Sequence, residues 1–169
     1  VDVVQLLLSK SDIDINKARD NGTTALYKAS QKGHVETVRL LLSKSDIDIN
    51  RATKDGRTVL YTASYEGHVE VVRLLLSKSD IDINKASGNG ATALYVASQE
   101  GHVEIVRLLL SKSDIDINNA RDDKATALYV ASQEGHVDVV RLLLSKSDID
   151  INKAKEEGAT ALFMASQKN

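Results

Sequence analysis

"TALYVASQEGHVEIVRLLLSKSDIDINNA" (residues 92–120) decides the fold, because near copies of this stretch fill the chain of 169 residues. The dipeptide Gly-His marks the register and returns every 34 residues, at Gly33, Gly67, Gly101 and Gly135. A fixed period of this size is typical of repeat architectures, in which each unit stacks on its neighbours. The sequence therefore predicts one continuous array over residues 1–169, with full units at 19–52, 53–86, 87–120 and 121–154 and half-units at 1–18 and 155–169.

Each unit carries the pattern of two helices followed by a non-helical third. Residues 35–44 place Val35, Val38 and Leu41 on one face at helical spacing, which predicts the longer helix. Residues 24–32 predict a shorter helix that begins at the N-cap Thr24 and ends at Gly33. Gly, Asn and Asp then gather in turn positions. Since one such unit is too small to bury a core alone, we expect an all-α solenoid of stacked helix-loop-helix units with β-turn fingers.

The octapeptide SKSDIDIN is identical in all five of its copies, at 9–16, 43–50, 77–84, 111–118 and 145–152. Its Asp-x-Asp-x-Asn spacing resembles the start of a calcium-binding loop, which also requires Gly at position six and Glu at position twelve. Counted from Asp46, those positions hold Arg51 and Arg57. The alternation of Ile47 and Ile49 with aspartates predicts an extended connector with one buried side instead. We therefore expect a ladder of stacked isoleucines and no metal site.

Composition argues against several classes of function. The chain is 42% hydrophobic, has a net charge of −2 and contains no cysteine. It has no basic footprint for nucleic acid or membrane surfaces and no apolar run of membrane-spanning length.

The histidines occur once per unit, about 10 Å apart in a stack, which is too far to share a metal ion. No catalytic triad, phosphate loop or dinucleotide motif occurs. We expect no enzymatic activity and no cofactor, and by default a cytoplasmic location.

The repeat resembles a known family more closely than its period suggests. A period of 34 residues is that of tetratricopeptide repeats, but their Trp, Gly-Tyr and Pro positions are not matched. In contrast, "GTTALYKASQKGHVETVRLLLSKSDIDINRA" (residues 22–52) resembles the ankyrin pattern G-x-T-P-L-H-x-A-A-x-x-G-H-x-E-V-V-x-L-L-L-x-x-G-A-D-V-N-A. The resemblance covers the whole chain. One extra residue follows the long helix, so we expect Ser45 or Asp46 to close that helix, Asp being tolerant of the left-handed region. Lys124 replaces the turn glycine of the other units.

This resemblance implies binding of a protein partner in a concave groove formed by the turn tips and the short helices. Positions that are identical in every unit share one structural task, whereas the variable positions are free for a partner. Tyr65 stands out, because other units have Gln there, and we pair it with Arg57, since Tyr and Arg are common binding anchors. The predicted partner-binding residues are Asp20, Asn21, Thr23, Lys54, Asp55, Arg57, Tyr65, Glu66, Asn89, Gln99, Glu100, Asp122, Asp123, Gln133 and Glu134. The acidic tips Asp122-Asp123 and Glu156-Glu157 favour a partner with a basic patch.

Near-identical units also fit a second class of function, a structural or self-stacking scaffold without a dedicated groove partner. The first half-unit is a long helix without its short one, and the last is a short helix without its long one. The tail of one copy could dock on the head of another, with Asn169 at the Gly position. Such head-to-tail self-association does not close and would give filaments. The sequence leaves both classes open and does not identify the partner.

Overall fold

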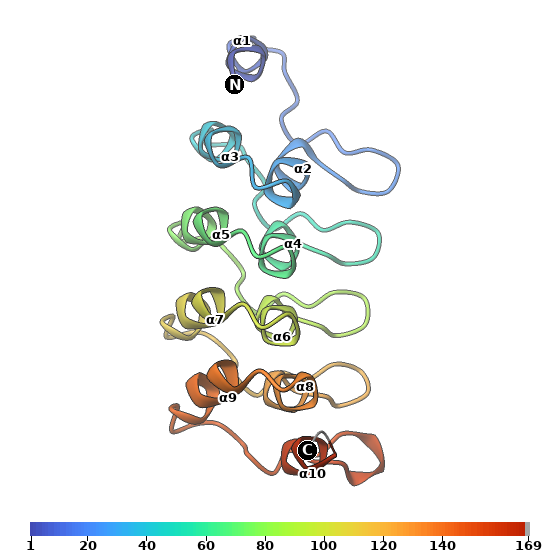
Figure 1. Cartoon of the computed structure of the whole chain (residues 1–169). Coiled ribbons are helices and arrows are strands. Elements are labelled where there is room, and N and C mark those ends of the chain that lie inside the picture. Colours follow the sequence, from blue (N-terminus) through green and yellow to red (C-terminus); the bar gives the residue numbers. More distant parts are fainter. Residues whose placement is uncertain (168–169) are drawn as a thin grey trace.

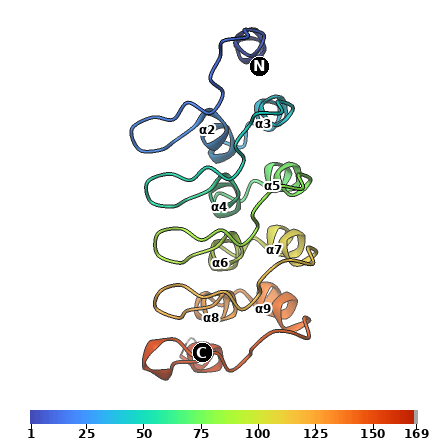
Figure 2. The same cartoon turned by 180° about the vertical axis from the view of Figure 1, so that it is seen from behind.

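The computed structural model describes residues 1–167, which contain two columns of helices stacked along one axis (Figure 1). The long helices form one column: α1 (Asp2–Leu8), α3 (Val35–Leu42), α5 (Val69–Leu76), α7 (Val103–Leu110) and α9 (Val137–Leu144). The short helices form the other: α2 (Ala25–Gln31), α4 (Val59–Tyr65), α6 (Ala93–Gln99), α8 (Ala127–Glu134) and α10 (Ala161–Ser166). A 3-10 turn, η1 (Glu156–Gly158), precedes α10. The loops that precede the short helices project away from the long-helix column, as the reverse view also shows (Figure 2).

Contacts between helices are sequential, as a solenoid requires. Each short helix from α2 to α8 contacts the long helix that follows it and the next short helix in its column, and the long helices from α3 to α9 contact one another in order. One apolar core runs through the stack and includes Leu26, Leu60, Leu94 and Leu128 from the short helices. The predicted all-α solenoid is confirmed. The limits of the single units stay a prediction, because a continuous core has no gap at which to divide it.

The short helices begin and end as the repeat predicts. The Thr24 hydroxyl accepts a hydrogen bond from the Tyr27 amide at 3.1 Å, and the same cap recurs at every short helix. Gly33 follows α2 with a φ of +67°, and a Cβ at this position would lie 2.7 Å from the ring of His68. The ring Nε2 of His68 donates to the Gln31 carbonyl oxygen at 3.0 Å. The glycine is thus needed both for the turn and for the close approach of the next repeat's histidine.

The ends of the long helices differ from the prediction. Helix α3 ends at Leu42, and the hydroxyl of Ser43 donates to the Leu40 carbonyl at 2.7 Å. Within residues 1–167, the non-glycine residues with positive φ are Lys124 and Glu157. The expectation that Ser45 or Asp46 closes the helix is therefore wrong. Ser43 satisfies a terminal carbonyl from a right-handed conformation, so no left-handed residue is required.

The octapeptide joins each repeat to the next. The side-chain amide of Asn50 donates to the Asp80 carbonyl at 2.6 Å, and its oxygen accepts from the Asp82 amide at 2.8 Å. The same pair of bonds is made by Asn16, Asn84 and Asn118. The second isoleucine of the octapeptide is buried in four copies, Ile15, Ile49, Ile83 and Ile117, whereas Ile151 in the last connector is 54% exposed. The first isoleucine, such as Ile47, is only partly buried, so the expected ladder forms on one isoleucine of each copy.

The lysine of the octapeptide also reaches a neighbouring repeat. The Lys44 ammonium donates to the carbonyl of Leu8 at 3.0 Å, and that of Lys112 donates to the carbonyl of Leu76 at 2.7 Å. Leu8 and Leu76 are the last residues of α1 and α5. A lysine at the end of one long helix thus stabilises the carbonyl end of the preceding one, where the helix dipole favours a cation.

Candidate functional site

Five β-turn loops, which we call fingers, form one wall of the candidate site (residues 19–23, 53–57, 87–91, 121–125 and 155–159). Each finger is closed by two backbone hydrogen bonds, such as Arg121 N to Ala125 O at 3.0 Å and Lys124 N to Arg121 O at 2.8 Å. One backbone bond joins each finger to the next, with N-to-O distances of 3.0, 2.8, 3.2 and 3.1 Å along the row. The fingers therefore form a continuous wall beside the short helices. We call the surface between this wall and the short helices the groove.

The larger hollow of the groove has a volume of about 590 Å³ and lies between the last two fingers and helices α6 and α8. Its lining residues are Tyr95, Gln99, Glu100, Arg121, Asp123, Ala125, Tyr129, Val130, Gln133, Glu134, His136 and Lys155. Five of the predicted partner-binding residues meet here: Gln99, Glu100, Asp123, Gln133 and Glu134. We call this the C-terminal hollow.

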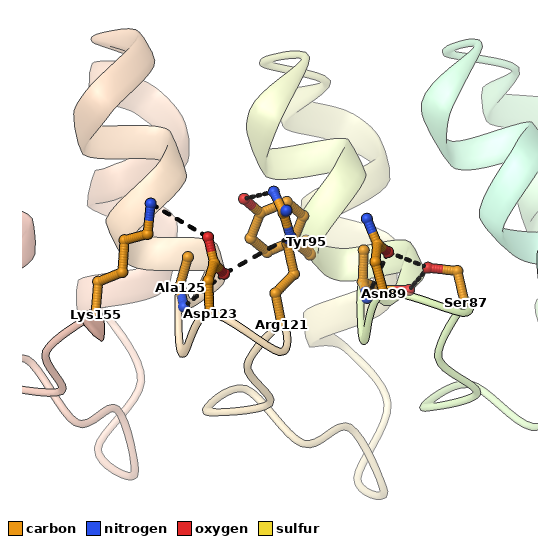
Figure 3. A network of polar contacts seen from close by, with 8 residues as sticks. Ser87, Asn89, Tyr95, Arg121, Asp123, Ala125 and Lys155 are labelled. Atoms are coloured by element: carbon orange, nitrogen blue, oxygen red, sulfur yellow. Dashed lines mark hydrogen bonds and ion pairs between the residues drawn. The ribbon is translucent and has the colours of Figure 1, made fainter.

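A polar network crosses the C-terminal hollow from finger to finger (Figure 3). The Arg121 guanidinium lies over the Tyr95 ring, 5.4 Å from its centroid, and Nη1 donates to the Tyr95 hydroxyl at 3.2 Å. Asp123 lies between two cations, with its Oδ1 3.7 Å from Arg121 Nε and its Oδ2 3.2 Å from Lys155 Nζ. Lys155 in turn lies over the Tyr129 ring at 5.7 Å. Both cations of this hollow are therefore already paired within the chain.

The pKa values of the network follow from these contacts. Burial acts to raise the pKa of Asp123, but hydrogen bonds from the Ala125 amide and Lys155, together with the charge of Arg121, lower it on balance. The hydrogen bond to Tyr95 raises the pKa of Arg121, and the hydrogen bond to Asp123 raises that of Lys155. All three groups are therefore held in their charged forms at neutral pH.

A smaller hollow of about 310 Å³ lies at the middle of the groove, which we call the central hollow. Its lining residues are Asp55, Arg57, Tyr61, Ser87, Gly88 and Asn89, of which Asp55, Arg57 and Asn89 were predicted partner-binding residues. The Arg57 guanidinium lies 5.7 Å from the Tyr61 ring centroid. Burial raises the pKa of Tyr61, although the charge of Arg57 opposes this. The hydroxyl of Tyr61 therefore stays neutral at physiological pH.

Seven predicted residues line neither hollow. Asp20, Asn21, Thr23, Lys54, Glu66 and Asp122 belong to the groove by position, and Tyr65 lies one turn after Tyr61 on α4 with 44% of its surface exposed. Sequence reasoning missed Tyr95, Tyr129, Arg121 and Lys155 as site residues. The tyrosines recur at one position of every full unit, so a search for variable positions does not find them, and pairing across repeats leaves no trace in a single unit. The available signal was that the first position of the finger holds a large cation in Arg19, Arg121 and Lys155 but is Thr53 or Ser87 in the other two fingers.

The fold agrees with the comparison with protein families. A family model described as ankyrin repeats in three copies matches residues 1–87, 51–121, 79–155 and 112–169, and so covers the whole chain. The chain belongs to the ankyrin-repeat family. Ankyrin repeats generally act as protein-interaction modules and are typically not enzymes. A search of curated proteins found no match to this ankyrin array.

In the part of the chain that the structure describes, no three His, Cys, Asp or Glu side chains gather in a way that could hold a metal ion. Over the same part, no helix combines the length and apolar character needed to cross a bilayer. The second aspartate of the octapeptide accepts a backbone hydrogen bond from two residues onward, as Asp48 does from the Asn50 amide at 3.2 Å.

Proposed function

We propose that this ankyrin array binds a protein partner through the groove between its fingers and short helices. The observation that carries the proposal is the separation of invariant and variable residues. The invariant octapeptide is occupied by bonds from one repeat to the next. Residues that differ between repeats lie in the fingers and along the exposed side of the short helices, where several of them line two hollows.

The construction of the groove supports this use. Its wall is a row of fingers joined by backbone hydrogen bonds, so a partner meets a surface that is already ordered. Ordering the surface before binding reduces the conformational entropy lost in the complex. Exposed Tyr65 and Arg57 are of the residue types that most often dominate binding energy at interfaces.

The proposal is tested with a partner captured by the full chain, whose affinity is then measured for matched variants. We expect Tyr65→Ala or Arg57→Ala to weaken binding tenfold or more, corresponding to roughly 1.4 kcal/mol. Arg39→Ala is the control, because Arg39 lies on the long helix α3 and its side chain is 58% exposed. Circular dichroism shows whether each variant is folded. A partner that is lost with Arg39→Ala and retained by both groove variants contradicts the proposal.

A second candidate function is head-to-tail self-association, which the exposed apolar faces of α1 and α10 favour. Leu7 in α1 is 52% exposed, whereas Leu41 at the equivalent position of α3 is 3% exposed. Leu162 in α10 is 79% exposed, whereas its equivalent Leu128 is 3% exposed. A second copy stacked end to end would cover both faces. The predicted role of Asn169 lies outside the described residues.

Sedimentation velocity over a dilution series tests this second candidate. Growth of the sedimentation coefficient with concentration, abolished by Leu162→Glu, supports end-to-end stacking. A single monomeric species at every concentration contradicts it. The cytoplasmic location expected by default stays a prediction.

A further inference from the structure

Two departures from the repeat lie in one unit, on either side of Tyr61. At the position of Arg57 the other units carry Thr23, Ala91, Ala125 and Ala159. At the position of Tyr65 they carry glutamine. Both side chains are exposed, and they flank Tyr61 of the central hollow from the finger and from the next turn of α4. Because the units are otherwise nearly identical, two exposed residues that differ in one unit alone indicate a role that the other units do not have.

Arg121 shows how this groove satisfies a guanidinium that lies over a tyrosine. It lies 5.4 Å from the Tyr95 centroid, donates to the Tyr95 hydroxyl, and pairs with the carboxylate of Asp123 at 3.7 Å. Arginine presents a planar fork of donors that matches a carboxylate. The complete arrangement therefore contains an aromatic ring, a guanidinium and a carboxylate.

Arg57 forms the contact between guanidinium and aromatic ring but has no carboxylate partner. Its guanidinium lies over Tyr61 at 5.7 Å. Among residues 1–167, no carboxylate lies within ion-pairing distance of Arg57, although Asp55 lines the same hollow. One repeat earlier, Ser87 stands at the position equivalent to Arg121, and Tyr61 at that of Tyr95. Ser87 has a short side chain, and its hydroxyl donates to Asn89 at 2.8 Å. Gly88 follows without a side chain, so the space beside Arg57 is open.

We propose that Arg57, held over Tyr61, binds a carboxylate side chain from an acidic segment of the protein partner, with Tyr65 packing against the same segment. This inference rests on the proposed groove function and names the chemistry of the partner. A charged hydrogen-bonded pair over an aromatic ring would reproduce between two molecules what Arg121, Asp123 and Tyr95 form within one. Of the four acidic tip residues that favoured a basic partner, Asp123 is already paired with Arg121 and Lys155.

The test uses a phage-displayed library of random linear peptides selected on the full chain. Selected peptides are synthesised, and their affinities are measured by fluorescence anisotropy. We expect enrichment in Asp and Glu, and a loss of about tenfold to a hundredfold in affinity with Arg57→Gln. Arg57→Lys keeps the charge without the fork and should recover part of this loss. Arg39→Gln on the long-helix column is the matched control and should leave affinity unchanged.

A double-mutant cycle assigns the contact to one carboxylate. Replacing the essential Glu of the peptide by Gln should cost as much as Arg57→Gln, and the two changes together should cost little more than either alone. Peptides that lose binding with Tyr65→Ala but are rich in Lys and Arg, or are insensitive to Arg57→Gln, overturn the carboxylate inference and leave groove binding intact. Failure to select any peptide, or selection only of peptides insensitive to every groove variant, contradicts the proposed function as well.

Discussion

At the scale of single residues, the asparagine of the octapeptide joins each repeat to the next through two hydrogen bonds. Asn84 donates to the Asp114 carbonyl at 2.7 Å and accepts from the Asp116 amide at 2.8 Å. One side-chain amide therefore satisfies both a donor and an acceptor of the next connector. No other neutral side chain of this size offers the two groups side by side, which is why the position does not vary.

We predict that Asn84→Ala lowers the free energy of unfolding by about 1–3 kcal/mol, because two hydrogen bonds between repeats are lost. Asn152 lies in the same octapeptide, but in the described part of the chain it has no following connector to bond. Asn152→Ala is therefore the matched control and should change stability much less. Chemical denaturation measures both, and equal losses would contradict the assigned role.

Lys124 has a backbone conformation that is unfavourable for a residue with a side chain. It holds a φ of +64° at the finger position where Gly22, Gly56, Gly90 and Gly158 have positive φ. A side chain in the left-handed region costs roughly 1–2 kcal/mol, which glycine avoids at some cost in backbone entropy. We predict that Lys124→Gly raises the free energy of unfolding by about 0.5–1 kcal/mol.

The reverse change serves as the control for the finger geometry. A Cβ on Gly90 would lie 2.9 Å from the amide nitrogen of Asp122 in the next finger, in addition to its φ of +81°. Gly90→Lys should therefore destabilise the array more than Lys124→Gly stabilises it. Thermal unfolding of the two variants side by side gives the comparison, and a stabilising Gly90→Lys would refute this view of the fingers.

At the scale of elements, the fingers behave as one wall because a backbone hydrogen bond crosses from each to the next. Backbone hydrogen bonds join all five, and the Arg121–Asp123–Lys155 network adds charge pairing to the last two. The network also fixes these fingers on the tyrosines of α6 and α8. The C-terminal hollow is therefore held more firmly than the central one.

Acid should weaken this finger contact selectively. The pKa of Asp123 is lowered from 3.8 in the folded chain, so between the two values the unfolded chain binds the extra proton. Its stabilisation is therefore complete well above pH 3.8 and is lost as the pH falls through the lower, folded value. We predict that Asp123→Asn, which retains an oxygen for the Ala125 amide, costs up to about 1 kcal/mol at neutral pH.

The pH profile distinguishes charge pairing from packing. The difference in unfolding free energy between wild type and Asp123→Asn should shrink as the pH is lowered below 3.8, because the wild-type carboxyl then becomes neutral. Urea denaturation at several pH values measures it. A difference that is constant with pH would assign the effect to packing or hydrogen bonding.

At the scale of the whole molecule, stability is shared between neighbours and is lowest where a neighbour is lacking. Helix α1 has no buried residue, and α10 has Ala161 alone. By contrast, Val71, Val72 and Leu75 of α5 are fully buried. In a stacked array each repeat contributes interfaces to the repeats on either side, so stability rises towards the middle.

We predict a matching gradient of amide hydrogen exchange in the 169-residue chain. Amides of α1 and α10 should exchange orders of magnitude faster than those of α5 and α7, because local opening of an end exposes little apolar surface. Hydrogen-exchange mass spectrometry measures this. Uniform protection along the chain of a monomer would contradict the nearest-neighbour view.

The sequence by itself determined the stacked helix pairs, the caps at each threonine and the buried isoleucines. Those features depend on the order of apolar and polar residues within one unit, so local sequence patterns are enough to predict them. The end of the long helix was mispredicted. The missing glycine suggested that Ser45 or Asp46 must close the helix, whereas the hydroxyl of Ser43 does so. About half of the predicted groove residues line the hollows, since variability identifies the exposed surface without showing where it is concave.

Only the tertiary structure decided which residues of different repeats meet. Asn50 with Asp80, Lys112 with Leu76, and Lys155 with Asp123 pair across about one period, and no single unit contains both partners. The same holds for Arg57, whose open site beside Tyr61 depends on the small residues of the next finger. A repeat sequence specifies the unit through local patterns, whereas the surface that a partner meets arises from stacking, which brings distant residues within bonding distance.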